Sequence, residues 1–185
     1  MPGSRSLSQR ISEGDGIAII VCVADAAGAR AAEEQGAKAI AVDAAVDGIR
    51  EATNLPLLWL GEGAPVDADA CAIRADGGAA AGHARTDGAG LETVVDVRDE
   101  EELEVVLETL DPEIFLLSSR HDDRDDPLDA VLELLPDVPA GKLAIAELLD
   151  ASADDVQALE RAGIDAVLVG SGHIGELVGA RPPEV

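Results

Sequence analysis

The sequence is poor in aromatic and sulfur-containing residues. Its 185 residues include no Tyr, one Phe (Phe115), one Trp (Trp59) and two Cys. The core must therefore be built from Ala, Val, Leu and Ile, which suit parallel strands that are buried on both faces. Cys22 and Cys71 stand alone in apolar runs without a Cys-x-x-Cys motif. We therefore expect both to be buried structural thiols.

Basic residues are also scarce. Thirteen Lys and Arg stand against 38 Asp and Glu, for a formal net charge of −25, and Lys38 and Lys142 are the only lysines. Such a surface repels nucleic acid and anionic membranes, so neither is an expected partner. The acidity fits a salt-rich cytoplasm or cationic partners. It also fits a solvated acidic surface in a lineage with GC-rich codons, the interpretation we favour, and composition alone supports each of them.

Several signals of targeting and metal binding are missing. Residues 1–16 lack the apolar segment of a signal peptide, and no apolar run approaches the length of a membrane span. We therefore expect a cytoplasmic protein. No His-x-x-His or clustered carboxylate motif indicates a metal, and no cofactor is predicted. His121 and His173 are isolated and are expected to be surface or loop histidines.

What the sequence does contain is a repeated alternation of apolar strands with helical segments, which predicts a parallel sheet. The expected strands are 17–23, 39–42, 55–60, 70–73, 91–97, 114–117, 143–148 and 166–169. Eight is the number at which such a sheet closes around a filled interior. We predict one compact (β/α)₈ barrel with short loops at 16–185, preceded by a short N-terminal extension at 1–15. An open, doubly wound sheet is the structural alternative.

Capping signals mark several of the intervening helices. Asp99 with Glu102 is typical of a capping box, Asp126 precedes a proline at the first helical position, and Ser152 with Asp155 opens another helix. The segment 77–90 is rich in small residues and Gly, so the fourth helix is expected to be weak or missing.

Four stretches of the second half resemble indole-3-glycerol phosphate synthase. They are 165–170 (DAVLVG, against V-D-A-V-L-V-G), 94–103 (VVDVRDEEEL, against L-V-E-V-H-D-E-E-E-L), 118–120 (SSR, against N-N-R or N-S-R) and 144–147 (AIAE, against V-V-S-E). More diffuse matches at 16–20 and 54–58 extend the resemblance over most of the chain. It implies a barrel related to a carbon–carbon lyase of tryptophan biosynthesis.

The chain departs from that family at the residues that carry its chemistry. Cys22-Val23-Ala24 stands where the resemblance calls for E-x-K, and Leu60 stands where it calls for the lysine that acts as general acid. The glutamate that acts as general base is shortened to Asp96. Leu148-Leu149 replaces an S-G pair that helps to hold phosphate. Each missing proton donor should cost about 10²–10⁴-fold in rate.

The candidate site lies at the carboxyl ends of the strands, where this fold places its active sites. Candidate catalytic residues are Glu147 and Asp96, and candidate ligand-binding residues are Ser118, Arg120, Gly170, Ser171 and Gly172. Loop amides at 170–172 suit a phosphate, although these glycines also fit a turn that needs positive φ.

The charged candidates also have structural explanations. Arg120 suits a phosphate or carboxylate, or a surface ion pair with the acidic residues at 122, 123 and 125. Glu147 could be paired with Arg120 or Arg74, and Asp96 with Arg98 or Arg74, in merely structural ion pairs.

Three hypotheses follow from these residues. The first is a barrel that binds a small phosphorylated or carboxylated ligand without full synthase activity. The second is an active lyase, or a related phosphosugar enzyme, that uses Glu147 and Asp96 as acid and base. The third is a non-catalytic scaffold, or a homo-oligomer that associates through a face left uncovered by the weak fourth helix.

Overall fold

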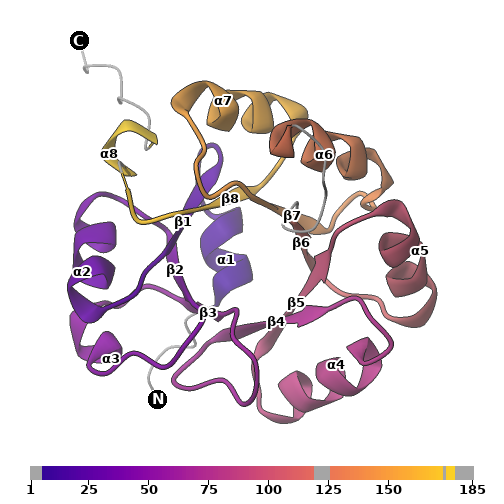
Figure 1. Ribbon diagram of the computed structural model, residues 1–185, viewed down its shortest axis with the longest axis horizontal. Helices are drawn as coiled ribbons and strands as arrows, with labels where there is room; N and C mark the ends of the chain where they lie inside the picture. The colour runs from indigo at the N-terminus through magenta and orange to yellow at the C-terminus, as the bar shows by residue number, and fades with distance from the viewer. Residues whose placement is uncertain (1–5, 119–125, 173, 178–185) are drawn as a thin grey trace.

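The computed structural model describes residues 6–118, 126–172 and 174–177, and it shows a closed barrel of eight parallel strands (Figure 1). The strands are β1 (Ala18–Cys22), β2 (Ala39–Val42), β3 (Leu57–Trp59), β4 (Ala70–Arg74), β5 (Glu92–Val97), β6 (Ile114–Ser118), β7 (Leu143–Glu147) and β8 (Ala166–Val169). β8 pairs with β1, with Ile19 beside Val167, and this pairing closes the ring. The (β/α)₈ prediction is therefore confirmed, and the open sheet is excluded.

Helices surround the barrel on its outer side (Figure 1). They are α2 (Ala26–Glu34), α3 (Ile49–Ala52), α4 (Ala79–Gly88), α5 (Glu100–Thr109), α6 (Pro127–Leu134), α7 (Ala153–Ala162) and α8 (Ile174–Leu177), with a 3₁₀ turn at Leu135–Asp137. Residues 60–69, all described, connect β3 to β4 without a helix. Among the described helices, none combines the length and the apolar character needed to cross a membrane.

The prediction of a weak or missing fourth helix is wrong. α4 follows β4 and is ten residues long. Its small residues allow close packing on the sheet, since a Cβ added at Gly82 would lie 3.2 Å from Cγ2 of Ile73. Tertiary packing thus outweighs the low helix propensity of this segment. The face from which self-association was expected is covered by α4, and self-association itself stays a prediction.

The predicted helix caps are largely confirmed. Ser152 and Asp155 form a full capping box at α7, and the Asp126 side chain accepts a hydrogen bond from Leu128 N at the start of α6. At α5, the Asp99 carboxylate accepts from Glu102 N at 2.8 Å, as expected. In a capping box the Glu102 carboxylate would accept from the backbone amide of Asp99. Here it accepts instead from Arg98 N, at 2.9 Å.

The core has two layers. One lies inside the barrel and combines alanines with larger aliphatic side chains such as Leu58, Leu116 and Ile145. The other lies between the strands and the surrounding helices and includes Phe115 and Trp59. Alternation along each strand sends successive side chains into the two layers, because neighbouring residues of a strand point to opposite faces.

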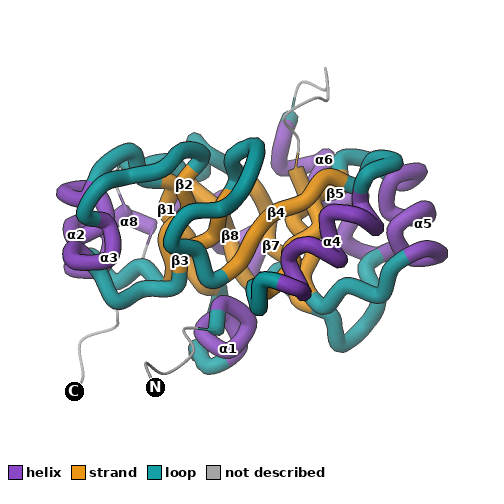
Figure 2. The backbone as a smooth tube through the Cα atoms, turned by 90° about the horizontal axis from the view of Figure 1, so that it is seen from below, coloured by secondary structure: helices purple, strands orange, loops and turns teal. Residues whose placement is uncertain are grey.

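A further helix, α1 (Leu7–Ser12), lies in the expected N-terminal extension and covers the amino-terminal end of the barrel. Figure 2 shows it beneath the strands, and Figure 1 shows it at the centre of the ring formed by the other helices. Leu7 and Ile11 are buried and join the interior cluster. We call this end of the barrel the foot, and the opposite end, where the strands terminate, the mouth.

Candidate functional site

The inward-facing residues of the mouth follow from the alternation of side chains along the strands. In β1, Ala18 and Ile20 belong to the interior cluster, and Cys22 packs against that cluster at the mouth end. In β7, Ile145 belongs to the same cluster, and Glu147 follows two residues later. Glu147 therefore faces the interior at the mouth, where this fold holds its ligands.

Ser118, Glu147 and Asp96 come from three consecutive strands and share this mouth. Ser118 and Glu147 are direct neighbours in the β6–β7 register, and they are 2% and 4% exposed. Asp96 of β5 is half-buried and lies beside Leu116 of β6. Each of the three takes part in a polar or electrostatic interaction. A hydroxyl can both donate and accept hydrogen bonds, whereas an ionised carboxylate only accepts them, so the set can orient hydroxyl or amine groups.

The arginines expected near Asp96 differ in their roles. Arg98 donates to the Glu102 carboxylate, with Nε at 3.0 Å from Oε1 and 3.1 Å from Oε2, and the pair also forms a salt bridge through Nη2. The hydrogen bond to Glu102, with smaller contributions from the charges of Asp96 and Asp99, raises the pKa of Arg98 above its ordinary value. Arg98 is thus held by Glu102, and Arg74 is the residue beside Asp96 in the register.

At Gly170, the first residue after β8, the backbone lies close to that of Leu149. The Gly170 amide donates to the Leu149 carbonyl at 2.9 Å, and a Cβ at this position would lie 3.0 Å from that oxygen. Neither Gly170 nor Gly172 has positive φ, so the turn interpretation is wrong for both. Glycine is needed at 170 for close approach of two backbones, while Ser171 and Gly172 are exposed at the mouth.

Helix α8 adds little to a site at this loop. It spans only four residues, and it begins after Gly172. An anion held here would therefore depend on the loop amides. Arg120, the predicted cationic ligand residue, lies outside the described residues, as do His121 and His173.

Three apolar side chains contribute to the opposite side of the mouth. Cys22 of β1, Leu60 after β3 and Ala72 of β4 are half-buried and pack against the interior cluster. Leu60 stands at the position where the family resemblance calls for the acid lysine, and it faces inward as that lysine would have to. The family resemblance had already placed Leu60 and Cys22 at this end of the barrel, but it missed Ala72, which the alternation within β4 could have revealed.

Neither lysine of the chain reaches the mouth. Lys38 immediately precedes β2, and Lys142 immediately precedes β7, so both lie at the foot as predicted. Lys142 Nζ forms ion pairs with Asp111 and Glu113, each at 2.9 Å. The hydrogen bonds to these two carboxylates raise the pKa of Lys142. Among the described residues, no group of three or more His, Cys, Asp or Glu could hold a metal ion.

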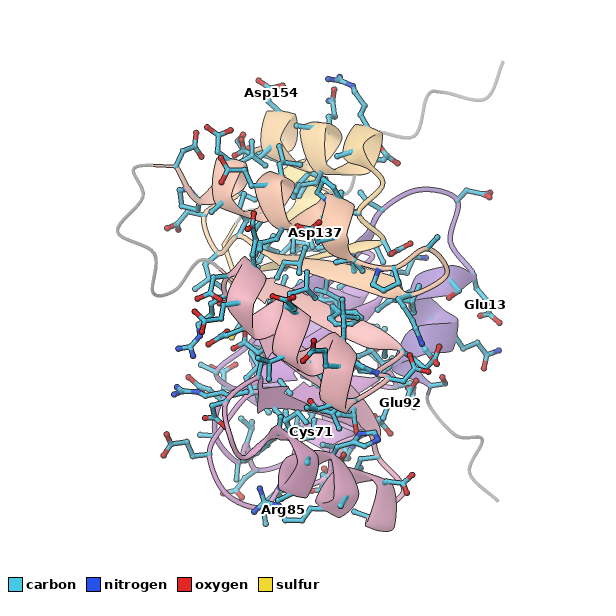
Figure 3. The ribbon with its side chains drawn as sticks, turned by 90° about the vertical axis from the view of Figure 1, so that its right-hand side faces the viewer. Glu13, Cys71, Arg85, Glu92, Asp137 and Asp154 are labelled. Carbon is cyan, nitrogen blue, oxygen red and sulfur yellow. The ribbon has the colours of Figure 1, made fainter. Side chains whose placement is uncertain are left out.

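The buried cysteine, Cys71, is expected to react slowly in the folded protein. Cys71 of β4 is 6% exposed, and its burial raises the pKa of the thiol, an effect partly opposed by the charge of Arg85 on α4 (Figure 3). Less thiolate is therefore present at pH 8, and the thiolate is the reactive form. In a Cys22→Ala variant, Cys71 should react with Ellman's reagent about tenfold or more slower when folded than in urea. Equal rates in the two states would contradict this prediction.

Comparison with known proteins agrees with the resemblance noted in the sequence. No family model matches the chain. It is similar to indole-3-glycerol phosphate synthase of Chlorobium limicola, with 37% identity over 83 residues, or 45% of this chain and 32% of that protein. It is also similar to indole-3-glycerol phosphate synthase 2 of Streptomyces coelicolor, with 40% identity over 89 residues, or 47% and 34% of the two chains. The matches thus span about a third of the relatives' length.

A solved structure gives independent support for the fold. The N-acetylmannosamine-6-phosphate 2-epimerase from Clostridium perfringens superposes with a TM-score of 0.69, covering 86% of this chain and 88% of that one. Its sequence identity is 17%, so this likeness shows the fold alone.

Proposed function

We propose that this chain is a ligand-binding barrel of the indole-3-glycerol phosphate synthase type. It binds a small phosphorylated or carboxylated molecule at its mouth and does not carry out the full synthase reaction. The similarity to synthases over nearly half of the chain supports the ligand class. In the loop at 170–172, the amide of Gly170 is already bonded to Leu149, and the exposed amides of Ser171 and Gly172 support phosphate binding, since glycine allows the backbone to approach an anion.

The inward position of Leu60 is the observation that supports the absence of the full synthase reaction. This side chain packs against the interior cluster at the mouth, together with Cys22 and Ala72. A hydrocarbon cannot donate a proton, and acid–base catalysis needs a donor within hydrogen-bonding reach of the reacting group. Binding through Ser118 and the loop amides needs no such donor. Ligand recognition and chemistry can therefore be separated in this barrel.

Titration calorimetry with a phosphorylated indole compound tests the binding. We expect heat of binding at submillimolar to millimolar ligand, and an affinity about tenfold weaker in Ser118→Ala, which removes a hydrogen-bonding hydroxyl from the mouth. Ser12→Ala is the matched control, because Ser12 lies on α1 at the foot, and its affinity should be unchanged. Absence of heat at millimolar ligand in the unmodified protein would contradict the proposal.

An assay of synthase activity, with indole fluorescence as the readout, tests whether the synthase reaction is absent. We expect no turnover above the uncatalysed rate. Turnover that is abolished by Glu147→Gln would instead identify an active lyase in which this carboxylate, 4% exposed at the mouth, serves as acid or base. Glu113→Gln, a change at the foot, would serve as the control for that loss.

A further inference from the structure

The helix at the foot is held to the barrel by few contacts. α1 has six residues, and an isolated helix of that length is not stable in water. Two of its side chains, Leu7 and Ile11, enter the interior cluster. Its formation therefore depends on docking against the barrel.

Among the described residues, a single carboxylate provides the polar part of this docking. Glu92, the first residue of β5, accepts hydrogen bonds from the backbone amides of Leu7 and Ser8 at the start of α1. Its two oxygens lie 3.3 and 3.2 Å from Ser8 N. Figure 3 shows Glu92 at the same end of the barrel as Glu13, which follows α1. Amides at a helix start have no partner within the helix, so Glu92 satisfies groups that the barrel would otherwise leave unbonded.

These bonds are not fully shielded, because Ser8 and Glu92 are only half-buried. A cavity of about 420 Å³ lies beside them, and Ser8 and Ser12 of α1 form part of its wall together with Glu92. The charged and titratable groups around it are His83 and Asp87 of α4 and Asp111 and Glu113 before β6, with Lys142 bound by the last two. His83 Nδ1 lies 3.1 Å from Thr93 Oγ1. Water in this cavity can compete with the α1 amides for the Glu92 carboxylate.

The link between α1 and β1 permits separate movement. Only residues 13–17 join the two elements, and they include Gly14 and Gly16, the second with φ of 105°. The far end of this link is anchored, because Ile17 N donates to Glu160 Oε1 of α7 at 3.2 Å. α1 can thus leave the foot while β1 keeps its place in the barrel.

We propose that α1 is a detachable plug, held by Glu92, that opens and closes while the eight-stranded barrel stays folded. Opening uncovers the foot of the interior cluster, where Ala18, Ala39 and Ala70 lie. Such local opening is the expected behaviour of an element with few buried contacts and solvent-accessible hydrogen bonds. This device lies at the end of the barrel opposite the mouth and does not depend on the ligand proposed there.

Hydrogen exchange of the full chain, measured by mass spectrometry, tests the plug. In Glu92→Gln, a neutral amide oxygen replaces the charged acceptor, and exchange of residues 7–12 should become about tenfold faster. Exchange in β6 and β7 should stay unchanged. Glu113→Gln is the matched control, because it alters a carboxylate of the same cavity that binds Lys142 and should leave exchange of α1 as it was.

A second variant gives an independent measure. Leu7→Asp should hold the plug open, so that the dye 8-anilinonaphthalene-1-sulfonate binds the uncovered foot while far-ultraviolet circular dichroism keeps its native shape. The proposal is overturned if exchange of residues 7–12 is insensitive to Glu92→Gln. It is also overturned if Glu92→Gln accelerates hydrogen exchange in α1 and in the strands by the same factor, since α1 would then open only with the whole barrel.

Discussion

Replacement of Phe115 by alanine is expected to lower the free energy of unfolding by about 3–5 kcal/mol. Phe115 is completely buried and is the only Phe of the chain. It belongs to the layer between strands and helices, and its register neighbours are Val95 of β5 and Ala144 of β7. Ala144 is too small to fill the space that the ring would leave. The loss is a large part of the roughly 5–15 kcal/mol by which domains are stable.

Urea unfolding followed by circular dichroism measures this loss. Val105→Ala on α5 is the control, because Val105 is 45% exposed, and its effect should stay within about 0.5 kcal/mol. A loss below about 1 kcal/mol for Phe115→Ala would show that the outer layer collapses around the missing ring. The expectation that Ala144 and the other neighbours cannot fill the space of the ring would then be wrong.

The second large effect is expected from salt. With 38 acidic and 13 basic residues, most carboxylates have no cation to pair with, and their mutual repulsion opposes the compact state. Raising KCl from 0.1 to 1 M shortens the screening length from about 10 to about 3 Å. We expect stabilisation on the order of 3 kcal/mol, which for a chain of this size corresponds to a rise in Tm of about 10 °C.

Thermal unfolding in a KCl series measures the salt effect. Screening predicts a rise that is steepest below about 0.5 M and then levels off, because the screening length contracts most at low salt. Sucrose serves as the uncharged control, since it stabilises by exclusion from the surface and gives no such levelling. A Tm that is the same at 0.1 and 1 M KCl would show that the surface carboxylates do not repel one another appreciably in the folded state.

The apolar pattern alone predicted the barrel strand by strand. Runs of Val, Ile, Leu and Ala marked all eight strands. The helix starts predicted at Ser152 and Asp126 were also correct. The segment of α4 was misjudged because Gly82 costs helix propensity locally but permits contact with Ile73, a gain that appears only on the folded sheet. The docking of α1 was missed for the same reason, since Leu7 and Ile11 have no partners until the barrel closes.

The positions of the candidate site residues in the barrel were predicted in part, and their roles stay predictions. Ser118, Glu147 and Asp96 were placed at the mouth from a family resemblance, and the register then made Ser118 and Glu147 direct neighbours. The binding of Arg98 by Glu102 was not foreseen, because either Asp96 or Glu102 lies within reach in the sequence and only the orientation of α5 distinguishes them.

The sequence by itself determined how many strands there are, about where each lies, that the strands are apolar on both faces and where the well-capped helices begin, because these properties depend on neighbours within a few residues. Tertiary structure alone decided which side chains from different strands meet and which end of the barrel α1 covers. Such neighbours are fixed by strand register and ring closure, and these depend on pairings between residues as distant as Ile19 and Val167.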